Sequence, residues 1–269
     1  MILDVSKIKY SIRDKKRRLK LPTKLDSTLA HIIGIHLGDG HSDHNSVKNS
    51  YSLEYTGHLT DEYGWYFKYI QPTFWKYFHL KGRLYSEIRE NSRSVRLNYR
   101  SKGLYQFFTY VLDLPPGKKD VWGIPKVVKQ GNLEIKRNFL KGVADTDFSL
   151  TFLRKDKNVL SKYPRISLST SNMNLAKELV ELIQELGFTT CSRYNFKTKG
   201  EDKEYNSNEI NINGKKNLEK WMKEIGFSSP KHITKYKIWK KCGYCPPYTT
   251  LQEREQVLRG ERDIKSLKK

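Results

Sequence analysis

Two stretches of this chain decide its fold: IGIHLGDG at residues 33–40 and KGVADTDF at residues 141–148. Gly34 aligns with Gly142 and Asp39 with Asp147, at an offset of 108 positions in each case (142 − 34 and 147 − 39). The polar–apolar alternation of strands, and then an amphipathic helix, follow each stretch. Self-similarity at a fixed offset indicates a structural unit present twice. The sequence therefore predicts an α+β fold made of two similar repeats.

The two copies are expected to share one order of strands and helices. In the first copy, a helix through residues 33–40 begins at an N-cap, Asp26 or Ser27. It is followed by a polar stretch, a strand at 51–56, a helix at 61–78, strands at 81–90 and 94–100, and a short helix at 102–112. The second copy has strands at 148–154 and 163–170, a helix at 174–186, strands at 188–197 and 205–213, and a helix at 215–225.

Small residues recur four positions apart in the helix that ends at each stretch: Gly34 and Gly38 in the first, Gly142 and Thr146 in the second. A glycine inside a helix costs about 1 kcal/mol relative to alanine, so it needs a structural reason. Close approach of two helix backbones is such a reason. We expect the two helices to pack together and to bring Asp39 and Asp147 near each other. Two carboxylates at helix C-termini are unfavourable unless a divalent cation binds them.

Charge and composition limit the function classes. The chain has 269 residues, enough for about two domains, and a net charge of +22 from 51 Lys+Arg against 29 Asp+Glu. Its 37% hydrophobic content excludes a disordered basic tail, no apolar run is long enough to span a membrane, and three cysteines suit a reducing compartment. So much positive charge favours a polyanionic partner: nucleic acid, a membrane surface or an acidic protein.

Alternating strands carry much of this charge on one face. In residues 95–100, Arg96, Asn98 and Arg100 share the polar face, and four other stretches repeat the pattern. Arginine and asparagine pair with guanine and adenine edges in the DNA major groove. A single strand of this kind would be an ordinary solvated face, but five of them in so basic a chain favour nucleic acid. The candidate DNA-contacting residues are Arg83, Tyr85, Arg89, Arg96, Asn98, Arg100, Arg165, Ser167, Arg193, Asn195, Asn211 and Asn213.

The segments GIHLGDG (34–40) and LKGVADTDF (140–148) resemble the two signature motifs of monomeric LAGLIDADG homing endonucleases in their double-motif form. The resemblance covers about residues 25–245. It implies two pseudo-symmetric αββαββα repeats, with the LAGLIDADG helices at the central interface and a DNA-binding β-saddle formed by both repeats. LPPGKK at 114–119, before GIP at 123–125, resembles the linker of archaeal members, and IGFSSPKH at 225–232 resembles the end of the second repeat.

The resemblance also implies domain boundaries. We expect a basic N-terminal arm at residues 1–24, a first repeat at 25–130, a second repeat at 131–245 and a charged C-terminal tail at 246–269, which forms a surface helix or a frayed end.

The chain departs from the family motif at three positions. Phe148 stands where the motif usually ends in glycine, and His36 replaces the first acidic letter in copy one, which Asp145 supplies in copy two. The last acidic letter, which is the catalytic one in the family, is present in both copies as Asp39 and Asp147.

By this resemblance, Asp39 and Asp147 bind two or three Mg²⁺ ions, assisted by the carbonyls of Gly38 and Thr146, and each acid serves one DNA strand. Mg²⁺ stabilises the attacking and leaving oxygens of phosphodiester hydrolysis. The family also uses lysines near the scissile phosphates. By position the candidates are Lys119 (or Lys118) and Lys231, for which plain phosphate contact is the alternative role.

Three functions share this fold: a site-specific DNA endonuclease, an RNA maturase that assists intron splicing, and a DNA-binding regulator that no longer cuts. Both acids favour the first over the third, while intron RNA remains an alternative partner to a long asymmetric DNA target. Without intein features at its ends, the chain is expected to be free-standing or intron-encoded and to act as a monomer. Its archaeal-like features suggest a cytoplasmic location, with an organelle as the alternative.

Overall fold

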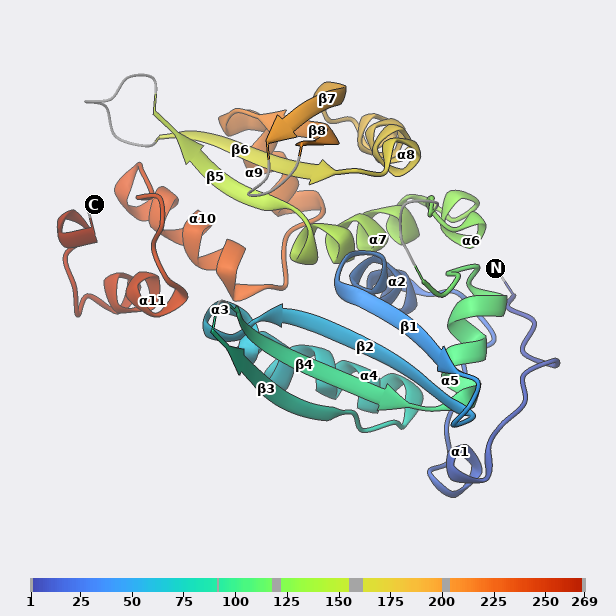
Figure 1. Cartoon of the computed structure of the whole chain (residues 1–269). Helices are drawn as coiled ribbons and strands as arrows, with labels where there is room; N and C mark the ends of the chain where they lie inside the picture. The colour runs from blue at the N-terminus through green and yellow to red at the C-terminus, as the bar shows by residue number, and fades with distance from the viewer. Residues whose placement is uncertain (1, 91, 118–121, 155–161, 200–203, 268–269) are drawn as a thin grey trace. The chain divides into compact units, whose positions relative to one another are not determined.

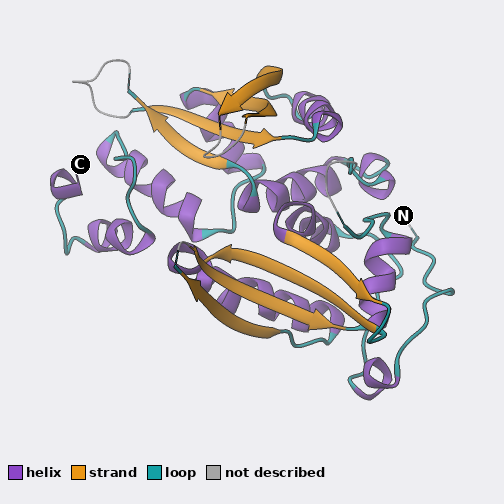
Figure 2. Ribbon diagram, in the orientation of Figure 1, coloured by secondary structure: helices purple, strands orange, loops and turns teal. Residues whose placement is uncertain are grey.

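The computed structural model describes residues 2–90, 92–117, 122–154, 162–199 and 204–267. It divides into two compact units, Met1–Thr146 (unit 1) and Asp147–Lys269 (unit 2). Figure 1 labels the helices and strands of both units, and Figure 2 shows the mixture of helices and strands in each. None of the described helices has the length and apolar character that a bilayer-spanning helix requires.

Unit 1 contains the first predicted repeat and the helix that opens the second. Its helices are α1 (Ile12–Lys16), α2 (Ser27–Asp39), α3 (Leu59–Trp65), α4 (Gln71–Phe78), α5 (Lys102–Gln106), α6 (Lys126–Lys129) and α7 (Leu133–Thr146), with π-helical turns at Tyr66–Ile70 and Phe107–Val111. Its strands are β1 (Gly40–Asn45), β2 (Ser50–His58), β3 (Arg83–Arg89) and β4 (Ser92–Arg100). Asp26 is the N-cap of α2, as predicted, and its side chain accepts a hydrogen bond from the Leu29 amide at 2.8 Å.

The strands of unit 1 form one antiparallel sheet in the order β1-β2-β4-β3. Helices α3 and α4 cover one face of this sheet (Figure 1). The core beneath them is aromatic: the Phe74 ring stacks on Tyr99 at 4.6 Å and meets Tyr55 edge-on at 5.3 Å. The other face of the sheet keeps the polar side chains, as the alternation predicts.

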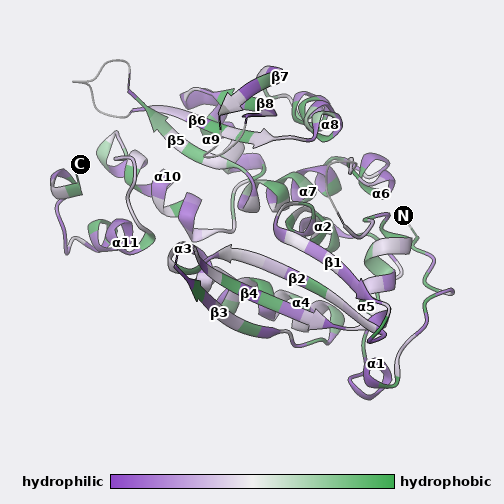
Figure 3. Cartoon of the chain, viewed as in Figure 1, coloured by the Kyte–Doolittle hydropathy of each residue, from purple (hydrophilic) through white to green (hydrophobic). Residues whose placement is uncertain are grey.

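Strand β1 was not predicted, because residues 40–45 read as a polar stretch. Figure 3 shows β1 as hydrophilic, whereas its counterpart β5 in unit 2 is largely hydrophobic. The inward positions of β1 are Gly40 and Ser42, and the side chain of Ser42 is 1% exposed. A Cβ atom on Gly40 would lie 2.4 Å from the Nδ1 atom of the buried His36, and the Ser42 hydroxyl lies 3.2 Å from Nε2 of the same ring. The buried histidine takes the place of the apolar residues that normally reveal a strand.

Unit 2 repeats the arrangement with different residues. It contains β5 (Ser149–Leu153), β6 (Tyr163–Thr170), α8 (Met173–Glu185), β7 (Cys191–Lys199), β8 (Glu204–Asn213), α9 (Lys215–Glu224), α10 (Pro230–Cys242), α11 (Leu251–Arg259) and a 3₁₀ turn at Ile264–Leu267. Its sheet order is β5-β6-β8-β7, the same topology as in unit 1. The predicted α+β fold with a duplicated four-stranded sheet is therefore confirmed.

Strand β7 breaks its alternation at a β-bulge. Arg193 lies opposite Glu209 and Phe196 lies opposite Ser207, so one extra residue is inserted between them. Asn195 adopts a positive φ of 49°, and its amide donates to the Asn208 side chain at 3.0 Å. Arg193 and Phe196 therefore share a face, and the guanidinium lies 4.3 Å from the centre of the Phe196 ring. The prediction that Arg193 and Asn195 share a face is wrong, because strict alternation cannot anticipate a bulge.

The two ends of the chain are packed onto their units rather than frayed. In the N-terminal segment Asp14 is fully buried, and in α11 Arg254 is 1% exposed. The Arg254 guanidinium donates from Nε to the Thr234 hydroxyl of α10 at 2.9 Å and from Nη1 to the Thr249 carbonyl. The predicted surface helix in the tail exists, and this buried arginine attaches it to α10.

Candidate functional site

Helices α2 and α7, which carry the two motif stretches, pack against each other in unit 1. A Cβ atom on Gly34 would lie 2.1 Å from the Phe139 carbonyl oxygen, and one on Gly142 would lie 2.2 Å from the His31 carbonyl oxygen. Both distances are far below van der Waals contact, so no other residue fits either position without moving a backbone. The predicted glycine-mediated packing of the two helices is confirmed.

A buried polar pair also joins these helices. The Nε2 atom of His31 lies 3.0 Å from the Oδ2 atom of Asp145, and the Tyr69 hydroxyl lies 3.3 Å from the Nδ1 atom of His31. The His31 side chain is 6% exposed and that of Asp145 is fully buried. Asp145, the first acidic letter of the second motif, thus links the helices. His31 and His36 are helix-packing residues.

Asp39 is the last residue of α2 and is half-buried. The Tyr66 hydroxyl donates to its Oδ2 atom at 2.9 Å. Burial, and then the nearby carboxylates of Asp39 and Glu62, raise the pKa of Tyr66 well above its ordinary value. Tyr66 therefore stays protonated and donates permanently, which fixes the orientation of the Asp39 carboxylate.

Asp147 directly follows α7 and is the first residue of unit 2. Its side chain is exposed, while the next residue, Phe148, is 1% exposed and packs with its ring centre 6.1 Å from that of Trp221. The departure from the motif glycine at Phe148 is thus a core-packing residue of unit 2. It leaves the acid before it at the surface.

The two other predicted metal ligands lie immediately before the acids. Gly38 precedes Asp39, and Thr146 is the last residue of α7. The Thr146 hydroxyl donates within its own helix, to the carbonyls of Gly142 at 3.2 Å and Val143 at 3.0 Å. Metal ligation by Thr146 would therefore use its backbone carbonyl, which belongs to the last turn of the helix.

The lysine candidates differ in what can be said of them. Lys119 and Lys118 lie outside the described residues. Lys231 is the second residue of α10, and its carbonyl accepts from the Nη2 atom of the buried Arg254 at 3.5 Å. Arg254 therefore fixes the backbone that carries Lys231, a feature that sequence reasoning missed because a lone arginine in a charged tail reads as solvated.

The polar face of the unit 1 sheet brings most of its predicted residues together. By strand register, Arg83 lies beside Asn98 and Tyr85 beside Arg96, while Arg89 sits at the far end opposite Ser92. Arg100 is the last residue of β4. These six candidates lie on one face, as predicted.

Glu54, which sequence reasoning overlooked, organises this face. Its Oε1 atom accepts from Arg96 Nη1 at 2.9 Å, and its Oε2 atom accepts from the Tyr85 hydroxyl at 3.0 Å and from Asn98 Nδ2 at 3.3 Å. Glu87 forms a second ion pair with Arg96, from Oε2 to Nε at 2.7 Å. The signal was available, since Glu54 occupies an outward position in an alternating strand.

The polar face of the unit 2 sheet is less charged. Arg165 lies opposite Asn213 and donates to its Oδ1 atom at 3.0 Å, and Ser167 lies opposite Asn211. Asn211 is 7% exposed, and its Oδ1 atom has no hydrogen-bond partner among the described residues. An amide oxygen held open on a polar surface is suited to accept a hydrogen bond from a ligand.

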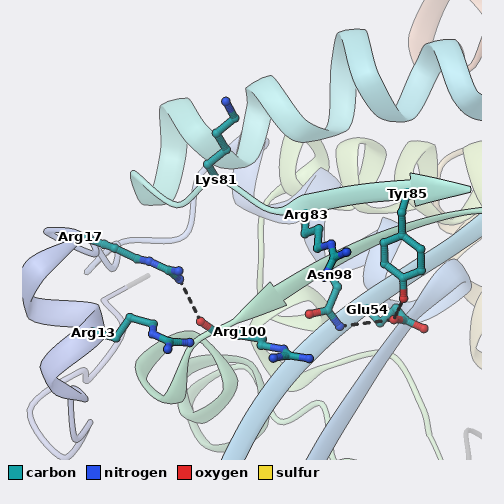
Figure 4. A pocket seen from close by; sticks show the side chains of 8 residues that line it. All are labelled: Arg13, Arg17, Glu54, Lys81, Arg83, Tyr85, Asn98 and Arg100. Carbon is teal, nitrogen blue, oxygen red and sulfur yellow. Dashed lines mark hydrogen bonds between the residues drawn. The ribbon is translucent and has the colours of Figure 1, made fainter.

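A pocket of about 510 Å³ lies at one end of the unit 1 sheet (Figure 4). Its lining residues are Arg13, Arg17, Glu54, Lys81, Arg83, Tyr85, Asn98 and Arg100. The run of cations at residues 13–18 had indicated a basic arm, but its contact with the sheet could not be read from the sequence. In the described part of the chain, no group of three or more His, Cys, Asp and Glu side chains is arranged to hold a metal ion.

Residues 134–226 match the family model of the LAGLIDADG-like domain. No curated protein matches the chain. A solved structure from mesophilic variants of the homing endonuclease I-DmoI is 16% identical, with a TM-score of 0.50 over 74% of this chain and 95% of that chain. Another I-DmoI variant, in complex with its target DNA and manganese, is 15% identical, with a TM-score of 0.50 over 74% of this chain and 93% of that chain.

Two further proteins share the fold. A mutant of I-SmaMI is 12% identical, with a TM-score of 0.51 over 91% of this chain and 97% of that chain. The homing endonuclease I-WcaI, bound to its DNA recognition sequence, is 16% identical, with a TM-score of 0.50 over 80% of this chain and 86% of that chain. At such low identities the similarity establishes a common fold, and activity has to be argued from the residues.

Proposed function

We propose that this chain, a double-motif LAGLIDADG protein, is a site-specific endonuclease that hydrolyses both strands of a long, asymmetric DNA target with the help of Mg²⁺. One observation carries the proposal: each motif helix keeps an aspartate at its C-terminal end, and the glycines before these acids hold the two helices in backbone contact. A protein that only bound DNA would have no need for both acids.

The donor set fits a hard divalent cation. Asp39 and Asp147 offer carboxylate oxygens, and Gly38 and Thr146 offer carbonyl oxygens from the ends of their helices. Mg²⁺ prefers such oxygen ligands and, when bound, would activate water and stabilise charge on the phosphate. The related I-DmoI variant was solved with manganese and target DNA, in keeping with divalent-metal use in this fold.

The other residues hold and orient the DNA. Tyr66 keeps the Asp39 carboxylate in one orientation, so the ligand is positioned before metal binds. Lys231 and Lys119 are proposed to stabilise charge near the scissile phosphates. The polar sheet faces would read base edges in the major groove, while the many other lysines and arginines contact phosphates.

The decisive experiment measures binding and cutting separately. Duplexes selected from a randomised library by metal-free binding would be cloned into a plasmid and incubated with Mg²⁺. The wild-type protein should linearise the plasmid. Asp39→Asn and Asp147→Asn should each abolish double-strand cutting, by roughly a thousandfold or more, and leave binding intact.

Asp113→Asn is the matched control, since it makes the same charge change at an exposed residue and should cut normally. If either acid variant still cuts both strands, the site assignment is wrong. Binding without cutting in Mg²⁺ or Mn²⁺ would identify a regulator. Selection of structured intron RNA in preference to every duplex would identify a maturase.

A further inference from the structure

The pocket at the end of the unit 1 sheet combines residues from the N-terminal segment and from the sheet. Arg13 and Arg17 come from α1 and its C-cap, and Lys81 precedes β3. Arg83 is the first residue of β3 and Arg100 the last of β4. Because β3 and β4 are antiparallel, these two arginines mark one end of the sheet, where the row of candidate base-reading residues stops. Figure 4 shows the side chains around this space.

The pocket has a strong excess of positive charge. Five of its eight lining side chains are cations, against one carboxylate, Glu54. That carboxylate is already engaged, because it pairs with Arg96 and accepts hydrogen bonds from Tyr85 and Asn98. None of the five cations forms an ion pair within the described part of the chain. Clustered, uncompensated cations raise the local concentration of anions and favour their binding.

Helix α1 is fixed in place by Asp14, which is fully buried. Its carboxylate accepts from the Ser101 hydroxyl at 2.6 Å and from the Gly103 amide at 3.1 Å, both just after β4. Burial by itself would raise the pKa of Asp14, but the hydrogen bonds from Ser101, Ser11 and Gly103 outweigh it and lower the pKa. The acid therefore stays ionised at neutral pH and keeps its bonds.

A second bond ties the pocket together. Arg17 Nη1 donates to the carbonyl of Arg100 at 3.2 Å (Figure 4). The N-terminal cations therefore have a defined position beside the sheet, unlike those of a flexible basic arm.

We propose that this pocket binds a backbone phosphate of the DNA beyond the base pairs that the unit 1 sheet reads, so that the N-terminal segment lengthens the target. This inference rests on the proposed function of the sheet as a DNA-binding surface. Arginine suits the role because its planar guanidinium donates two parallel hydrogen bonds to phosphate oxygens. The contact adds affinity and register without base specificity.

The test compares two double variants in the same short helix. Arg13→Ala/Arg17→Ala removes two cations that line the pocket, and Lys15→Ala/Lys16→Ala removes two exposed cations that do not. Both lower the net charge equally. Binding to the selected duplex is measured in metal-free buffer over a range of salt concentrations. The arginine variant should bind roughly tenfold more weakly and lose about 0.9 of the log–log salt slope per phosphate contact. Equal losses in the two variants would overturn the proposal.

Target length provides an independent readout. When the duplex is shortened stepwise, the deficit of the arginine variant should disappear after truncation from one end only. A deficit that persists on the shortest bound duplex would contradict a contact beyond the base pairs read by the sheet. Asp14→Asn should also weaken binding although it adds positive charge, because α1 loses its anchor. All readouts use uncut DNA, so a protein that binds but never cuts would refute the endonuclease proposal and leave this one standing.

Discussion

The two four-stranded sheets share one topology but differ in the chemistry of their polar faces. Strand register matches the row His41–Glu54–Asn98–Arg83 of unit 1 with the row Ser149–Ser167–Asn211–Cys191 of unit 2. In the adjacent row, Arg96 and Tyr85 of unit 1 correspond to Glu209 and Arg193 of unit 2. Only the asparagine is common to both rows.

This difference changes what each asparagine can offer. The Asn98 amide nitrogen donates to Glu54, whereas Asn211 faces Ser167 and its Oδ1 atom has no partner among the described residues. Unit 1 presents an arginine held between two carboxylates, and unit 2 presents hydroxyl and amide groups. Duplication thus preserved the strand order and let the faces diverge, which suits an asymmetric target whose two halves differ in sequence.

The largest expected effect concerns what the two copies still share, the glycine contact between α2 and α7. Gly34→Ala and Gly142→Ala should each destabilise the protein by about 3 kcal/mol or more, because the new methyl group meets a backbone carbonyl that cannot move aside cheaply. The two losses should be similar, since the contact is reciprocal. Denaturant unfolding measures both.

Gly64→Ala is the control for this pair. Gly64 lies in α3, and a Cβ atom there would meet nothing within 4 Å, so alanine should stabilise the helix by about 1 kcal/mol. If Gly34→Ala proved as stable as the wild type, or if only one of the two variants were destabilised, the equivalence of the motif helices would be disproved.

The sequence was informative about the fold wherever burial follows the periodicity of the element. Strand 163–170 was predicted with its observed bounds, and the helix at 174–186 lies within one residue of α8. Periodicity failed in β1, whose inward positions hold Gly40 and Ser42 against a buried histidine. It failed again at the β7 bulge, where one extra residue reverses the faces.

The site was less predictable, because most of it depends on contacts between residues far apart in the sequence. The matched offset singled out Asp39 and Asp147, and alternation singled out Arg96 and Asn98. Nothing local reveals that Glu54 neutralises Arg96 or that Tyr66 orients Asp39. Such partners are chosen by strand register and helix packing, which a single sequence does not display.

The chain ends offer a second comparison, in which a buried carboxylate fixes the N-terminal segment and a buried guanidinium fixes α11. Arg254→Met should destabilise unit 2 by about 2–4 kcal/mol, because it removes the bonds to Thr234 and Thr249 and leaves their polar atoms buried. Hydrogen exchange should increase in α10, including the amide of Lys231.

Arg259→Met is the matched control for this prediction. It lies in the same helix, pairs with Glu261 at the surface and should change stability by less than about 1 kcal/mol. An Arg254→Met protein whose α10 exchanges as slowly as in the wild type would show that the tail merely rests on the unit.

The smallest expected effect tests the two polar faces directly. Glu54→Ser places the unit 2 residue in the unit 1 row, removes one of the two carboxylates that hold Arg96 and reduces repulsion of DNA phosphates. Binding to random duplexes should become roughly two- to fivefold tighter, and the preference for the selected target should fall. Ser167→Glu, the reciprocal change, should weaken binding by a similar factor. Glu181→Ser, at an exposed position of α8, makes the same charge change as Glu54→Ser away from the strands and should have no effect on the preference. If Glu54→Ser and Glu181→Ser behaved alike in a competition assay at fixed salt, the Glu54–Arg96 network would not lie on the surface that DNA approaches, and the two faces would differ for a reason unrelated to recognition.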